Sequence, residues 1–144
     1  MPDIRFIYQG DKVDLQRESM CKKVCEFLAS KINLPKNIEI VFAKMDKSDY
    51  GNTIIDGRFP NRINLNDKLI AKEIPYVLVH ELIHLNQIKE GLLIAASNNM
   101  CIWRGKLYRV DSTIDYKSYT QLPWEQDVNQ RYKVLLAETL NSVS

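Results

Sequence analysis

The chain has 144 residues, of which 45% are hydrophobic and 26% charged, and its formal net charge is +2. These values are close to the average for globular proteins, and the mixed charges give no reason to expect a nucleic-acid partner. No apolar stretch has the length of a membrane span or of a signal-peptide core, so we expect one cytoplasmic domain over residues 1–144 with no membrane partner.

The first half of the chain alternates strand and helix patterns. Residues 4–8 read as a first strand, and apolar residues recur at helical spacing from Val13 to Ile32. The β-branched stretch 38–45 predicts a second strand. Cys21 and Cys25 lie on one face of the predicted helix, which is typical of buried thiols. The odd number of cysteines, three in all, predicts reduced side chains, not disulfides.

Two shorter strands are predicted next, at residues 52–57 and 61–66. They flank a turn that runs from Gly57 to Pro60. Proline has no backbone N–H to donate, so it is found mostly at the edges of sheets. We therefore expect the segment 61–66 to be an edge strand.

The helix predicted from Pro75 to Glu90 is unusual because it is apolar on nearly every side. Proline fits its first turn, and Gly91 provides a natural stop. A helix that is apolar all round is buried on both sides. The residues that make it so are Val77, Leu78, Val79, Leu82, Ile83, Leu85 and Ile88.

The last third of the sequence predicts a hairpin and a helix. The hairpin covers residues 101–110 and turns at Arg104-Gly105-Lys106. The helix runs from Pro123 to Leu140 and carries an apolar stripe. The pattern as a whole predicts an α+β fold: a small mixed sheet of three to five short strands, an N-terminal helix, a buried central helix and a C-terminal helix.

Both histidines of the chain lie in the central helix, at positions 80 and 84, and Glu81 follows the first of them. Residues four apart on a helix project from the same side, so the two imidazoles can reach one ion. Catalytic zinc commonly has three protein ligands and a water, whose pKa it lowers to about 7. Glu81 is placed to take a proton from that water, which is the chemistry of the HExxH pattern of zinc peptidases.

The third ligand has to be a downstream acid, because the chain has no third histidine. We favour Glu125, which lies in the first turn of the C-terminal helix, where the apolar stripe predicts packing against the histidine helix. Asn129 lies one turn further and could hydrogen-bond a ligand imidazole. The other downstream acids are Asp111, Asp115, Asp127 and Glu138.

In these residues the chain resembles the gluzincins, zinc peptidases with HExxH on one helix and a glutamate ligand on a later one. It is most similar to their minimal single-domain forms and to small zinc peptidases predicted in phage genomes. The resemblance covers His80 to His84 and Glu125 to Asn129, and Asn129 stands where many gluzincins have an aspartate. It implies a zincin-like core with Zn²⁺ held by His80, His84 and Glu125, in the host cytoplasm if the protein is phage-encoded.

The rival resemblance is to the aspzincins, whose aspartate ligand lies in a GTxDxxYG stretch. The sequence STIDYKSY shares Thr113 and Asp115 with it, so Asp115 stays open as the alternative third ligand.

A peptidase also needs a donor for the oxyanion of the scissile carbonyl and a surface for the substrate. The zincin resemblance implies that an extended peptide pairs with the edge strand, here expected at residues 61–66. Four residues are candidate oxyanion donors: Tyr116, Tyr119, Arg131 and Tyr132.

The function predicted from the sequence is hydrolysis of a peptide or protein substrate, with Glu81 as the general base. Two alternatives remain open, a catalytically silent zinc-binding interaction or inhibitory protein and a hydrolase of a non-peptide amide.

Overall fold

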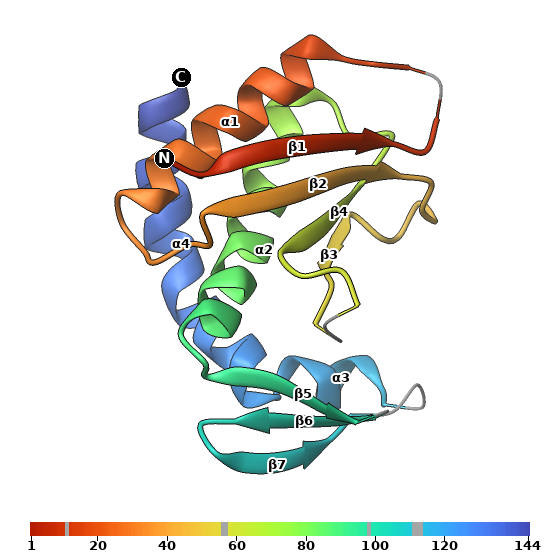
Figure 1. The fold of residues 1–144 in the computed structure, drawn as a ribbon, viewed down its shortest axis with the longest axis vertical. Coiled ribbons are helices and arrows are strands. Elements are labelled where there is room, and N and C mark those ends of the chain that lie inside the picture. The colour runs from red at the N-terminus through yellow and green to blue at the C-terminus, as the bar shows by residue number, and fades with distance from the viewer. Residues whose placement is uncertain (11, 56–57, 98, 111–113) are drawn as a thin grey trace.

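A mixed four-stranded sheet with helices packed on one face makes up the larger part of the computed structural model (Figure 1). The structure describes residues 1–10, 12–55, 58–97, 99–110 and 114–144. The strands are β1 (Asp3–Tyr8), β2 (Asn37–Ala43), β3 (Gly51–Thr53) and β4 (Arg62–Asn66), and their order in the sheet is β1-β2-β4-β3. β2 pairs in parallel with β1 and β4, whereas β3 runs antiparallel to β4.

Three helices lie on one side of this sheet. They are α1 (Leu15–Ala29), α2 (Ile74–Lys89), which follows the short 3₁₀ turn Ala71–Glu73, and α4 (Pro123–Val143), which packs against α1 and α2. In β2, alternate side chains point toward the helices, because successive residues of a strand face opposite sides of the sheet. These side chains belong to Ile38, Ile40 and Phe42, and each is at most 2% exposed.

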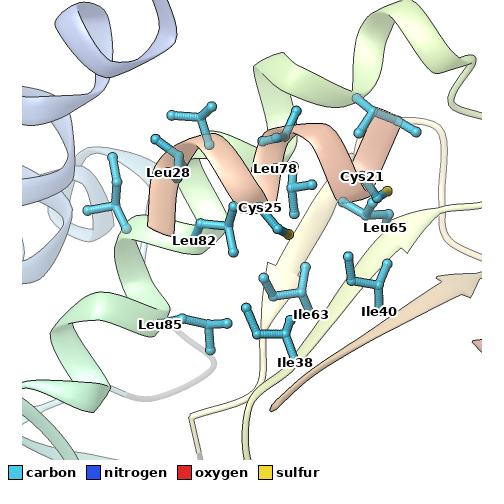
Figure 2. Packing of buried hydrophobic residues seen from close by; sticks show 14 of the residues in the cluster. Cys21, Cys25, Leu28, Ile38, Ile40, Ile63, Leu65, Leu78, Leu82 and Leu85 are labelled. Atoms are coloured by element: carbon cyan, nitrogen blue, oxygen red, sulfur yellow. The ribbon is translucent and has the colours of Figure 1, made fainter. Parts of the chain in front are cut away.

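The core lies between α1, α2 and the sheet. Figure 2 shows Cys21, Cys25 and Leu28 of α1 facing Leu78 and Leu82 of α2, with the isoleucines of the strands beneath them. All five of these helix residues are fully buried. Both cysteines are free thiols, as predicted, and burial raises the pKa of the Cys25 thiol to about 12.

The central helix is buried on both sides, as its composition predicted. It begins with Pro75 in its first turn and ends where Gly91 adopts a φ of 74°. The N–H of Leu92 then donates to the carbonyl of Gln87 (2.9 Å), and that of Gly91 donates to Ile88 (3.0 Å). These two bonds form a Schellman cap, which a residue with positive φ makes possible.

A second, antiparallel sheet follows α2. It consists of β5 (Leu93–Ser97), β6 (Met100–Trp103) and β7 (Lys106–Arg109), and the hairpin of β6 and β7 turns where predicted. A five-residue helix, α3 (Tyr116–Thr120), leads into α4. A small apolar cluster joins this sheet to the start of α4 and comprises Leu93, Trp103, Leu122 and Trp124.

The α+β class, the mixed sheet and the three long helices are confirmed. The prediction that residues 61–66 form an edge strand is wrong, because β4 is paired on both sides and β3 is the edge. Pro60 precedes the strand and therefore removes none of its ladder bonds, so it gave no information about the edge.

Other boundaries also differ from the predictions. The predicted strand 52–57 is described only as β3, and its last residues, Asp56 and Gly57, lie outside the described residues. The N-terminal helix begins at Leu15 after an Asp14 N-cap and ends at Ala29, inside its predicted bounds. β5 and α3 were not predicted. In the described part of the chain, no helix combines the length and the apolar character needed to cross a membrane.

The burial of α2 on both sides predicts a large cost for truncating its core side chains. Leu82 is 0% exposed, so Leu82→Ala is expected to lower the free energy of unfolding by about 2–5 kcal/mol through lost transfer energy and the cavity left behind. Urea denaturation measures this. Val134→Ala on α4, where the side chain is 63% exposed, is the control and should change the free energy of unfolding by less than about 0.5 kcal/mol. Equal effects of the two substitutions would contradict the packing described.

Candidate metal centre

A cleft of about 700 Å³ lies where α2, α3 and α4 meet the edge strand β3 and the segment before it. Its wall includes the two histidines and the glutamate of α2, together with Glu125 of α4. Five of the seven tyrosines of the chain also line it: Tyr50, Tyr76, Tyr116, Tyr119 and Tyr132.

Three potential ligands converge in this cleft. Nε2 of His84 lies 2.9 Å from Oε2 of Glu125, and Nε2 of His80 lies 3.4 Å from Oε1 of the same carboxylate. One ligand atom from each residue lies within 4.8 Å of the other two. His84 and Glu125 are buried, whereas the side chain of His80 is 33% exposed and opens the group toward solvent.

Helix geometry explains this convergence. His80 and His84 project one turn apart from α2, and their ring centroids are 5.1 Å apart. Glu125 stands in the first turn of α4, where the helix dipole favours a carboxylate. Leu78, Leu82 and Val128 belong to one buried cluster, so the packing of α2 against α4 sets the distance between the acid and the imidazoles.

The donor set fits a divalent transition metal. Tetrahedral ligands about 2.0–2.1 Å from zinc lie roughly 3.3 Å from one another, close to the two nitrogen–oxygen distances found here. Two imidazoles and one carboxylate are also the ligand set of several catalytic zinc sites, which leave a fourth position for water or substrate. The residues present therefore suit zinc with an open coordination position.

The tautomer of His84 is set by Gln87, one turn further along α2. The amide nitrogen of Gln87 donates to the Trp124 carbonyl (2.8 Å) and to Oδ2 of Asp127 (2.9 Å). Its oxygen therefore faces Nδ1 of His84, 2.8 Å away, and accepts the proton that this nitrogen carries. Nε2 faces Glu125 in the cleft, and once it gives up the proton that it shares with this carboxylate its lone pair is directed at the cleft, as a metal ligand requires.

A polar network continues behind Gln87. The guanidinium of Arg131 donates to Oδ2 of Asp127 and to Oδ1 of Asn86, each at 2.9 Å. The side-chain amide of Asn86 donates in turn to the carbonyl of Asn33 (2.9 Å). The position of the His84 imidazole is thus tied to α4 and to the segment that follows α1.

The electrostatics of the ligand group depend on the two imidazoles. Burial alone would raise the pKa of Glu125, but the hydrogen bonds from His80 and His84 outweigh it and lower that pKa to about 2. Burial lowers the pKa of His84, yet the hydrogen bond and charge of Glu125 reverse this, and the net shift is upward. A cation that binds here meets an ionised carboxylate and competes with a proton for Nε2 of His84.

Glu81 lies on the wall of the same cleft but is not part of the ligand group. Its side chain is held by the edge strand β3, where the hydroxyl of Thr53 donates to Oε1 at 2.8 Å. Glu81 is only 6% exposed, so the carboxylate reaches the cleft without lying in open solvent.

Among the acids considered from the sequence, the structure brings Glu125 to the histidines. Asp115 caps α3, where it accepts from the N–H of Ser118 (2.7 Å), and it is not in the ligand group. Asp127 belongs to the network behind Gln87, and Glu138 pairs with Lys31. Asp111, like Thr113, lies outside the described residues.

The residue that supports a ligand histidine differs from the one expected. Asn129 lines the cleft, but the side chain that accepts the hydrogen bond from Nδ1 of His84 is that of Gln87. Sequence reasoning missed Gln87, although a polar side chain three residues after a ligand in an otherwise apolar helix was a usable signal. Thr53 was also missed, because nothing in the sequence links it to Glu81.

Three of the four candidate oxyanion donors line the cleft. Tyr119 donates to Oε2 of Glu125 at 3.4 Å, and its pKa is raised by burial and by the nearby carboxylates. Tyr132 donates to the carbonyl of Tyr76 (2.6 Å), and its ring contacts that of His80. Tyr116 is 83% exposed. Arg131 is engaged in the network behind Gln87 and does not line the cleft.

Comparison with known proteins gives no independent guide to this site, because no protein-family model, curated protein or solved structure matches the chain.

The contact between Gln87 and His84 predicts a metal-affinity phenotype. Gln87→Met removes the acceptor for Nδ1 while keeping a side chain of similar length. We expect it to raise the dissociation constant for zinc about 10–100-fold, as loss of an outer hydrogen bond to a ligand histidine typically does. Titration against a competing chelator measures this. Asn129→Ala is the matched control and should leave zinc affinity unchanged, and the opposite ranking would restore Asn129 to the supporting role.

Proposed function

We propose that this protein is a zinc-dependent peptidase that hydrolyses peptide bonds with Glu81 as the general base. The observation that carries the proposal is the convergence of His80, His84 and Glu125 in one cleft, with a second acidic residue, Glu81, on the same wall. This arrangement combines a three-ligand site with a carboxylate that the site does not need for binding.

His80, His84 and Glu125 would hold the ion through the two Nε2 atoms and the carboxylate. Zinc bound there would lower the pKa of a coordinated water to about 7 and polarise the scissile carbonyl. Gln87 keeps the His84 ring in the tautomer that ligation needs.

Glu81 would accept a proton from the attacking water and pass it to the leaving amine. Its burial supports this role, because a carboxylate shielded from solvent exchanges protons with the bound reactants. Tyr119, whose hydroxyl reaches Glu125, and Tyr132, whose ring contacts that of His80, are candidate donors to the developing oxyanion.

The free edge of β3 offers a surface for an extended peptide. Tyr50 accepts from the N–H of Asn66 (2.9 Å), and Ile54 donates to the carbonyl of Arg62 (3.0 Å). In an antiparallel pair such bonded residues alternate with residues whose N–H and C=O point away from the partner strand. Gly51 and Thr53 therefore direct theirs toward the cleft side, where a substrate backbone could pair.

Metal removal tests the first half of the proposal. The purified protein is expected to contain about one zinc per chain, since the described residues include one group of three potential ligands. Dialysis against a chelator should abolish cleavage of a degenerate peptide library, and added zinc should restore it. Elemental analysis of His84→Ala, which lacks a ligand, should find little zinc. A native preparation free of metal would contradict the proposal.

Replacement of the base tests the second half. Glu81→Gln should retain zinc, because Glu81 is not a ligand, but cleave about 10²–10⁴-fold more slowly. The control is Glu90→Gln at the end of the same helix, outside the cleft, which should cleave like the wild type. Equal rates for the wild type and Glu81→Gln would remove Glu81 as the base.

Retained zinc with no cleavage of any peptide, followed by turnover on a panel of small amides, would indicate the non-peptide alternative. No turnover on either would indicate a silent zinc-binding protein.

A further inference from the structure

The contact between Thr53 and Glu81 links the edge strand to the proposed general base. The hydroxyl of Thr53 lies 2.8 Å from Oε1 of Glu81 and 3.1 Å from the backbone carbonyl of the same residue. A hydroxyl has one proton to donate, and the contact with Oε1 is the shorter of the two. The proton therefore goes to Oε1, and Oε2 is the oxygen left for a proton from water.

The distance between β3 and α2 is fixed by close packing. A Cβ added to Gly51 would come within 2.8 Å of Cγ1 of Val77 on α2 and 2.9 Å of the carbonyl of Asn64 on β4. No side chain fits between the strand and the helix at that point, so the backbone of β3 lies directly against α2. Thr53, two residues further along the strand, is thereby held within reach of Glu81.

Thr53 thus has two roles in the proposed site, one through its side chain and one through its backbone. Its hydroxyl holds one oxygen of Glu81, and its backbone N–H and C=O lie on the free edge of the sheet. A peptide paired with that edge would lie in register with the residue that orients the base.

We propose that Thr53 is a positioning residue that sets the orientation of the Glu81 carboxylate relative to a substrate paired with β3. This role rests on the proposed peptidase function, with Glu81 as base and β3 as the substrate edge. Small errors in the placement of a catalytic group cost up to about 100-fold in rate. We therefore expect loss of the Thr53 hydroxyl to lower kcat. KM depends on backbone pairing with β3, which a change of side chain leaves in place.

The test compares three variants of the full-length, zinc-loaded protein. Thr53→Val keeps the shape of the side chain but has no hydroxyl to donate, whereas Thr53→Ser keeps the hydroxyl. Thr120→Val is the matched control, because Thr120 also lines the cleft but donates to the carbonyl of Lys117 (2.9 Å). The measurements are kcat and KM on a peptide that the wild type cleaves, and zinc content.

We expect Thr53→Val to lower kcat about 10–100-fold with KM and zinc content unchanged. Thr53→Ser should recover kcat to within about threefold of the wild type, and Thr120→Val should match the wild type. Loss of zinc, a rise in KM with kcat unchanged, or no recovery by serine would overturn the positioning role.

A second measurement is independent of turnover. Crystal structures of the zinc-loaded wild type and of Thr53→Val report the position of the Glu81 carboxylate directly. The wild type is expected to have one conformation, with Oε1 on Thr53, and Thr53→Val a displaced or divided one. The same single conformation in both would overturn the proposal. If the wild type binds zinc but cleaves nothing, the peptidase function fails, while these structures still decide whether Thr53 positions Glu81.

Discussion

The burial of α2 on both sides is the constraint on which the rest of the structure depends. Four polar side chains of this helix, those of Glu81, His84, Asn86 and Gln87, are at most 6% exposed. An unpaired polar group costs several kcal/mol in such surroundings. Each therefore has a partner on another element: Thr53 on β3, Glu125 and Asp127 on α4, and the carbonyl of Asn33 after α1. The candidate metal centre is part of this network of partners.

Sequence patterns predicted most of the architecture because the periodic signals are strong there. The continuous apolar run of α2 and the stripe of α4 identified both helices, and helical spacing identified the two imidazoles. Glu125 could be favoured because it begins a helix whose apolar stripe had to pack against another element. The order of strands within the sheet could not be read, because β3 and β4 are short and either one could have been the edge.

The supporting contacts were harder to predict for a different reason. Thr53 lies 28 positions before Glu81 in the chain and reaches it only because β3 packs against α2. Gln87 lies only three residues after His84, but its orientation depends on Trp124 and Asp127 of another helix. Asn129 was chosen because it lies one turn after Glu125. In the structure, Nδ1 of His84 instead donates to Gln87, a residue of α2 itself. α3 was missed because five residues carry too little periodicity to distinguish a helix from a turn.

The bond from Gln87 to the Trp124 carbonyl has a consequence for how an ion would enter and leave. It fastens the helix that carries the histidines to the first turn of the helix that carries the glutamate, using only protein atoms. The proposed ligand atoms are thus held near one another by contacts between protein groups. Exchange of the proposed zinc ion would then be a local event that leaves the two helices joined.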